Sequence, residues 1–240
     1  MSERLSNIIR RDSRFTPAAS LNVEVIADFV CPFCFIGKRR FDEALHAVKG
    51  PSEVSWYPFQ LNPAIPAEGL SFEEYLTQRF GSTANVQPVL DYLTAEGKAA
   101  GIDFRFDRLR HVPNTLAIHQ LMLLAESRQV DQSALAEDLL SAFFEHGRNI
   151  GDSDELVAIS DVHGITADDV QEAIKEDKIR QLVLTRERHV RGSGMSGVPG
   201  YLLNRRLLVV GAQSTDTFVN AFDQAMFGVG TDALLSPALH

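Results

Sequence analysis

Residues 21–48 read LNVEVIADFVCPFCFIGKRRFDEALHAV. The first part of this stretch, residues 21–29, is short and rich in valine and isoleucine, which predicts a β-strand. From Pro32 onward, apolar residues recur at helical spacing as far as Val48, which predicts an α-helix. The CPFC motif of residues 31–34 therefore lies where a strand passes into the first turn of a helix.

The chain contains two cysteines, Cys31 and Cys34, and their placement suits thiol–disulfide exchange. Unpaired N–H groups in the first turn of a helix favour a thiolate at Cys31, and the thiolate is the reactive form. Cys34 lies one turn further on the same face, where it can resolve a mixed disulfide formed at Cys31. Pro32 suits the first helical position, which needs no N–H, and Phe33 places an apolar ring beside the sulfur. The motif thus predicts a nucleophile, a resolving cysteine and two substrate contacts.

Charged residues near the motif allow structural interpretations as well as functional ones. Asp28 is a candidate base for the Cys34 proton, but an aspartate at this position also ends strands or caps helices. The basic run 38–40 is expected to form the solvated face of the helix rather than to act on the thiols. The seven histidines are scattered, with no pair four residues apart and none expected close to the cysteines. No metal site is predicted.

Further along the chain, the pattern changes twice. Residues 53–59 predict a second strand, which completes a βαβ unit. A capping box at residues 71–74 then opens an all-α block, with helices expected at 71–80, 85–99, 114–129, 132–147, 153–163, 166–177 and 178–191. After a glycine-rich stretch, strands at 200–203 and 207–210 and a helix at 215–227 form a ββα unit.

These segments predict an α/β fold whose βαβ and ββα halves are separated by an all-α insertion. The expected discontinuous domain covers residues 21–69 and 192–228, and the insertion covers 70–191. Residues 1–20 and 229–240 are expected to be tails.

Composition narrows the class of partner. The 240 residues include 32 acidic and 23 basic side chains, giving a net charge of −9, so neither nucleic acid nor anionic membranes are expected as partners. Neither a signal peptide nor a spanning apolar run is visible, which predicts a cytoplasmic protein. Two cysteines are too few for a disulfide-built scaffold or a four-cysteine zinc site. Monomer and homodimer are both compatible with the sequence.

The segments 28–38 (DFVCPFCFIGK), 56–63 (WYPFQLNP), 197–199 (GVP) and 211–213 (GAQ) resemble the DsbA family, in particular its FrnE-like branch. The resemblance covers nearly the whole chain. It implies a thioredoxin fold interrupted by a helical domain, and thiol–disulfide oxidoreductase activity without a cofactor beyond the redox-active disulfide.

The resemblance also implies that Pro199 is a cis-proline facing the cysteines, with Val198 before it as a substrate-docking edge. The residues alone equally allow a proline that simply enters a strand. Two departures from the family pattern stand out. Phe33 replaces the usual tryptophan, and Gly200-Tyr201 replaces Phe-Phe. Substrate preference is therefore less transferable than the type of reaction.

The reaction expected is dithiol–disulfide exchange with protein or low-molecular-weight thiol substrates. Its direction is not encoded in the motif, although a reducing cytosol favours reduction or isomerisation. Glutathione is a candidate co-substrate, with Gln213 and Ser214 at the start of the last helix as contacts. A plain N-cap at Ser214 or Thr215 is the simpler interpretation.

Two alternatives stay open at this level. The first is a glutathione-dependent isomerase or transferase resembling 2-hydroxychromene-2-carboxylate isomerase and the kappa-class transferases, which share the inserted fold. Those families typically have serine where Cys31 stands, and they need no resolving Cys34. The second is a binding module in which the two cysteines form a structural or regulatory bridge, although so short a loop would stabilise little.

Overall fold

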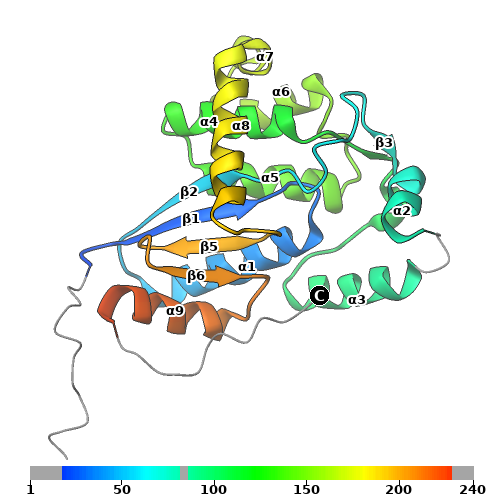
Figure 1. Ribbon diagram of the computed structural model, residues 1–240. Coiled ribbons are helices and arrows are strands. Elements are labelled where there is room, and N and C mark those ends of the chain that lie inside the picture. Colours follow the sequence, from blue (N-terminus) through cyan, green and yellow to red (C-terminus); the bar gives the residue numbers. More distant parts are fainter. Residues whose placement is uncertain (1–17, 82–85, 229–240) are drawn as a thin grey trace, which may run out of the picture.

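A computed structural model describes residues 18–81 and 86–228, so the predicted tails fall almost entirely outside the described residues. Its central sheet has four strands in the order β2-β1-β5-β6 (Figure 1). These are β1 (Leu21–Ala27), β2 (Ser52–Pro58), β5 (Gly200–Leu203) and β6 (Leu207–Val210). β1 and β2 run parallel, whereas β5 is antiparallel to both β1 and β6. This is the arrangement expected of a βαβ unit joined to a ββα unit.

Helices α1 (Pro32–Val48) and α9 (Thr215–Phe227) pack against one face of this sheet. Phe41 of α1 stacks on Tyr201 of β5 with ring centroids 5.1 Å apart, and Phe218 of α9 meets Tyr201 edge-on at 4.7 Å. Phe222 completes this group, and all four rings are at most 1% exposed. We refer to these four residues as the α1–α9 core.

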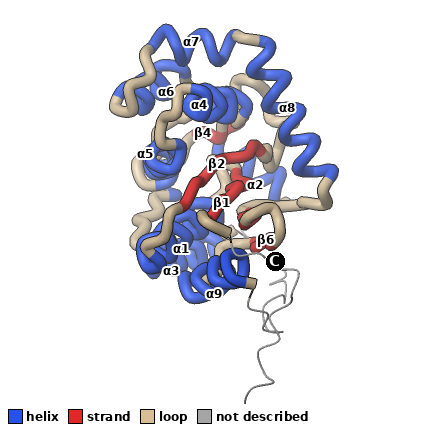
Figure 2. The backbone as a smooth tube through the Cα atoms, turned by 90° about the vertical axis from the view of Figure 1, so that its left-hand side faces the viewer, coloured by secondary structure: helices blue, strands red, loops and turns tan. Residues whose placement is uncertain are grey.

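The segment between β2 and β5 is mostly helical. It contains α2 (Phe72–Phe80), α3 (Gln87–Ala99), α4 (Leu116–Ser127), α5 (Gln132–Phe144), α6 (Ser153–Asp161), α7 (Ala167–Lys175) and α8 (Asp177–Gly192). Helices α4 to α8 gather on the β2 side of the sheet, whereas α3 lies on the same side as α1 and α9 (Figure 1, Figure 2). α4 is the centre of the larger group, because residues 118–125 are all buried.

Between the β2 side of the sheet and this helical group, aromatic rings alternate with polar side chains. Phe29 stacks on Trp56 at 6.1 Å, and the backbone N–H of Trp56 donates to the Gln132 side chain at 3.1 Å. Asp28 and His119 are buried in the same region, at 1% and 3% exposure. We refer to Asp28, Phe29, Trp56, His119 and Gln132 as the β2-side interface.

Most of the predicted elements are confirmed. The strands at 200–203 and 207–210 and the helix at 215–227 have the expected bounds. The capping box is also present, with Ser71 and Glu74 each bonding the other's backbone N–H. The helical segment additionally contains a short antiparallel pair, β3 (Leu70–Ser71) with β4 (His111–Val112), and the single turn Phe106–Arg108. Two-residue strands are too short for periodicity to reveal. The division of the chain at residues 69 and 192 stays a prediction.

The interpretation of residues 38–40 as a solvated face is wrong. Lys38 is only 3% exposed, and its Nζ lies 2.6 Å from Asp42 and 2.8 Å from Glu137 of α5. Arg40 bonds Glu96 of α3 at 2.7 Å. The insertion packs against this face of α1, so basic side chains that would be solvated on an isolated helix become buried partners of its carboxylates.

Candidate active site

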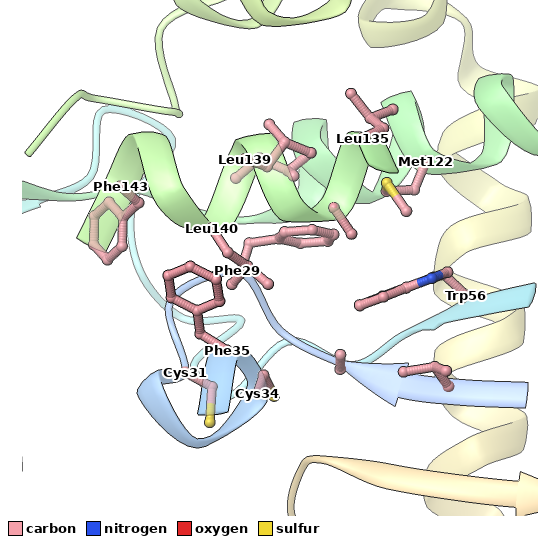
Figure 3. Close-up of a cluster of buried hydrophobic side chains, with 14 of the residues drawn as sticks. Phe29, Cys31, Cys34, Phe35, Trp56, Met122, Leu135, Leu139, Leu140 and Phe143 are labelled. Atoms are coloured by element: carbon pink, nitrogen blue, oxygen red, sulfur yellow. The ribbon is translucent and has the colours of Figure 1, made fainter. Parts of the chain in front are cut away.

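The two cysteines lie at the start of α1, beside the hydrophobic cluster that joins this helix to the insertion (Figure 3). Cys31 is the N-cap residue with extended backbone angles, and Pro32 follows at the first helical position. The N–H of Cys34 donates to the carbonyl oxygen of Cys31 at 3.0 Å, which closes the first turn. Both thiols are free. The strand-to-helix junction predicted from the sequence therefore places the motif as expected.

The environments of the two sulfurs differ. Cys31 keeps 4% of its surface exposed, compared with 1% for Cys34. The Cys34 sulfur accepts a bond from the backbone N–H of Asp28 at 3.5 Å. Burial, and then the hydrogen bond and charge of Cys31, raise the pKa of the Cys34 thiol well above its usual value. Cys34 therefore keeps its proton at neutral pH, and using it as a nucleophile requires a group that takes this proton.

The loop before β5 faces the first cysteine. The Val198–Pro199 peptide bond is cis, as the family resemblance implied. The Cys31 thiol donates to the Val198 carbonyl oxygen at 3.9 Å, and the Pro199 carbonyl accepts from the N–H of Gly211 at 2.8 Å. Val198 is half-buried, as are Pro32 and Phe33 on the other side of the cysteine. These half-buried residues border Cys31 from two segments far apart in the sequence.

Asp28 lies directly behind the motif, and its buried carboxylate binds two backbone amides. Oδ1 accepts from the N–H of Phe29 at 2.9 Å, and Oδ2 accepts from the N–H of Leu61 at 2.7 Å. It does not cap α1, whose N-cap is Cys31 and has no side-chain cap. Asp28 therefore ties the end of β1 to the loop after β2, while its own N–H contacts Cys34.

A histidine outside the predicted site residues lies beside Asp28. His119 Nε2 is 3.6 Å from Asp28 Oδ1, and its ring meets Phe29 edge-on at 5.5 Å. His119 lies 85 residues after Cys34, so sequence distance concealed its contact with Asp28. The available signal was a His-Gln pair within the otherwise apolar run LAIHQLMLLA of residues 116–125.

A second unpredicted contact involves Gly37 and Tyr201. A Cβ at Gly37 would lie 2.5 Å from the Tyr201 hydroxyl oxygen, so glycine is what allows the two elements to approach. Tyr201 is 1% exposed and its hydroxyl has no partner among the described residues. Burial, and then the charge of Cys34, raise the pKa of this phenol well above its usual value. The departure from the family's Phe-Phe pattern thus puts a polar atom near the motif.

The candidate glutathione contacts are already engaged in local bonds. Ser214 is the N-cap of α9 and accepts from the N–H of Thr217 at 3.2 Å, so the N-cap interpretation is confirmed. The Gln213 side chain donates to the Val210 carbonyl at 2.7 Å.

Within residues 18–81 and 86–228, no cluster of His, Cys, Asp and Glu suits a metal ion. The same part of the chain contains no helix with the length and apolar character needed to cross a bilayer.

Three features can now be compared with known families. They are the βαβ–ββα sheet with its helical insertion, the dicysteine at the start of α1 and the cis-proline that faces it. The profile of the DSBA-like thioredoxin domain matches residues 22–223. The chain belongs to this family. The fold predicted from the sequence, a thioredoxin fold with a helical insertion, is thereby confirmed.

Individual proteins agree with this assignment. The probable DsbA oxidoreductase SCO1869 from Streptomyces coelicolor is 30% identical, with a TM-score of 0.78 over 91% of this chain and 94% of that one. The uncharacterized protein YwbO of Bacillus subtilis is 26% identical over 84% of this chain and 96% of its own length. The cytosolic disulfide reductase DsbM from Pseudomonas aeruginosa, solved with GSH, has a TM-score of 0.57 at 19% identity, covering 85% of this chain and 95% of that one, and shows the fold alone.

Proposed function

We propose that this chain is a thiol–disulfide oxidoreductase in which Cys31 attacks a substrate disulfide and Cys34 resolves the product. The observation that carries the proposal is the asymmetry of the two thiols. Cys31 is the helix N-cap and contacts the carbonyl of the residue before cis-Pro199. Cys34 is more deeply buried and is held by a backbone N–H. The more accessible sulfur is the attacking one, and the enclosed sulfur meets its partner only after the first step.

In the reductive direction, the Cys31 thiolate attacks one sulfur of a substrate disulfide and displaces the other as a thiolate. Cys34 then loses its proton and attacks the Cys31 sulfur. The bond between Cys31 and the substrate breaks, the Cys31–Cys34 disulfide forms, and the released substrate sulfur takes a proton. Two protein thiols are oxidised and one substrate disulfide is reduced. The reverse sequence oxidises a dithiol, and the redox poise of the compartment sets the direction.

Extended protein segments and small thiols are both suitable substrates for this site. The backbone of Val198 forms the docking edge, and the half-buried rings of Pro32 and Phe33 form its apolar border. We extend the proposal to glutathione as a co-substrate, held at Gln213 and Ser214, and to a cytoplasmic, FrnE-like protein that works as a reductase or isomerase. The fold shared with a cytosolic reductase solved with GSH supports this extension.

Insulin reduction and refolding of scrambled ribonuclease test the proposal. Cys31→Ser is expected to abolish turnover, because the nucleophile is gone. Cys34→Ser is expected to trap a mixed disulfide between Cys31 and substrate, which mass spectrometry of the quenched reaction detects. The double variant is the matched control, since it should show neither turnover nor adduct. Wild-type turnover in both single variants would contradict the redox role. Isomerisation of a hydroxychromene carboxylate that persists in Cys34→Ser would instead support the glutathione-dependent isomerase.

A further inference from the structure

His119 occupies an unusual position for a titratable side chain. It lies in the fully buried stretch 118–125 of α4, and its Nε2 has no hydrogen-bond partner among the described residues. Leaving a buried imidazole nitrogen unpaired is unfavourable, so such a group calls for an explanation. The polar atom facing it is Asp28 Oδ1 at 3.6 Å. This is just beyond hydrogen-bond length.

The contacts continue from this pair to the resolving cysteine. Asp28 Oδ1 accepts a single backbone bond, from Phe29, and so retains capacity for a second donor. The N–H of the same aspartate donates to the Cys34 sulfur. His119 also borders a cavity of about 10 Å³ together with Phe29 and Trp56, so its ring is not tightly packed on every side. The imidazole thus lies against the Asp28 carboxylate, and the backbone N–H of the same aspartate contacts the Cys34 thiol.

We propose that Asp28 accepts the proton that Cys34 loses, and that His119, as a positioning residue, acts through Asp28 by sharing that proton. The inference rests on the proposed function, because Cys34 loses a proton only if it resolves a mixed disulfide. The proton passes from the Cys34 thiol to the pair, the Cys34 sulfur attacks Cys31, and the departing substrate thiolate is finally protonated. A lone carboxylate that takes this proton loses its charge in an apolar site, whereas the pair can carry the proton on either partner.

Other titratable groups around the pair have partners of their own or stay neutral. Tyr57 borders the same cavity, and Tyr75 is close enough that, after burial, the charge of Cys31 raises its pKa. Phenols remain protonated at neutral pH. On α4 and the helices around it, eight charged or titratable side chains are engaged in the ion pairs Glu187–Arg191, Arg186–Glu126, Arg128–Asp169 and His163–Asp138. His119 and Asp28 form the buried titratable pair whose contacts lead to the Cys34 sulfur.

Reaction of the reduced protein with dithiobis(nitrobenzoate) separates the two steps. The first thionitrobenzoate is released when Cys31 attacks, and the second is released when Cys34 resolves the adduct. His119→Gln and Asp28→Asn are expected to slow the second release about tenfold or more, and to move its pH dependence to higher pH, because a general base is lost. The first release should keep its rate. His163→Gln is the matched control, since it removes the histidine of a His–Asp pair at 2.8 Å elsewhere in the insertion, and both releases should be unchanged.

The double variant Asp28→Asn/His119→Gln is expected to be no slower than Asp28→Asn, because residues that act as a unit are not additive. The single tryptophan, Trp56, borders the same cavity as His119, so its fluorescence reports whether each variant is folded. His119→Asn serves as a second variant at the histidine. The proposal would be overturned if a folded His119 or Asp28 variant released the second thionitrobenzoate with the wild-type rate and pH profile. Additive losses of this rate in the double variant, or misfolding of both His119 variants, would overturn it as well. Absence of the first release in the wild type would instead refute the proposed function itself.

Discussion

The α1–α9 core and the β2-side interface are both buried, but they are built from different chemistry. In the core, four aromatic rings meet at centroid distances between 4.7 and 6.2 Å, and the Tyr201 hydroxyl is their only polar side-chain atom. In the interface, two aromatic rings alternate with a carboxylate, an imidazole and an amide. The core gains stability from apolar burial alone. In the interface, desolvating the polar groups costs free energy, and the packing places His119 against Asp28, whose backbone N–H contacts the Cys34 sulfur.

The largest effect is expected from breaking the core. Phe218 is fully buried and contacts Phe41, Tyr201 and Phe222, so Phe218→Ala should lower the free energy of unfolding by about 3–5 kcal/mol. Urea titration followed by circular dichroism measures the loss. Phe227, at the end of the same helix, is 56% exposed, and Phe227→Ala should change stability by no more than about 0.5 kcal/mol. Equal losses in the two variants would remove the basis for calling these rings a core.

A smaller loss of stability is expected when Gln132, the amide of the β2-side interface, is replaced. Gln132 accepts from the Trp56 N–H and donates to the Met122 carbonyl at 2.8 Å, so Gln132→Ala leaves the buried Trp56 N–H unpaired and removes one bond to the Met122 carbonyl. The expected loss is about 1–3 kcal/mol, measured by the same titration. Gln87 forms an exposed bond to Asp91, and Gln87→Ala provides the control, with a change below about 0.5 kcal/mol. No loss on Gln132→Ala would mean that water replaces the amide and that this interface is not closed.

Variants at Gly37 and Tyr201 test how the Tyr201 hydroxyl, the polar atom inside the α1–α9 core, affects stability. Gly37→Ala should cost about 1–2 kcal/mol, because overpacking against the hydroxyl exceeds the gain in helix propensity. In a Tyr201→Phe background the oxygen is absent and the cost should shrink, which a double-mutant cycle measures. Tyr201→Phe alone should be neutral or slightly stabilising, because the hydroxyl it removes has no partner. Additive effects would show that the hydroxyl is not what Gly37 accommodates.

The smallest expected effect is a slope of stability with pH. The pKa of Cys34 is raised in the folded, reduced protein, so above its usual value of 9.0 the unfolded chain releases this proton first. Stability should therefore be at its full value below about pH 9 and fall above it, by at most about 1.4 kcal/mol per pH unit for this group. Urea midpoints of the reduced protein between neutral and alkaline pH measure the slope. Cys34→Ala should flatten it, and an unchanged slope would assign the alkaline loss to other groups.

How far the sequence could predict the molecule depended on the range of the contacts. The strands at 200–203 and 207–210 and the helix at 215–227 follow from local periodicity and turn residues, and they were predicted with the correct bounds. Lys38 was misjudged because its carboxylate partner Glu137 lies 99 residues away. Periodicity identifies which face of a helix is polar, but not whether another element covers that face.

In the candidate site too, the roles that depend on neighbouring residues were predicted, whereas a contact between distant segments was missed. The roles suggested for Cys31 and Cys34 come from adjacent residues, because a three-residue spacing at the start of a helix puts two sulfurs within one turn. The cis state of Pro199 came from family resemblance, and the structure contains it. His119 was missed, since nothing in the local pattern distinguishes a histidine that faces Asp28 from one that is simply buried.

By itself, the sequence determined the order of elements, the place of the dicysteine motif at the start of α1 and the class of chemistry available there. These properties depend on neighbours within one or two turns, where geometry follows from covalent connectivity. Only the tertiary structure decided that Cys34 is the enclosed thiol, that Val198 faces Cys31 and that His119 reaches Asp28. Burial and electrostatic environment are set by groups from distant segments, and these meet only when the insertion packs against the sheet and α1.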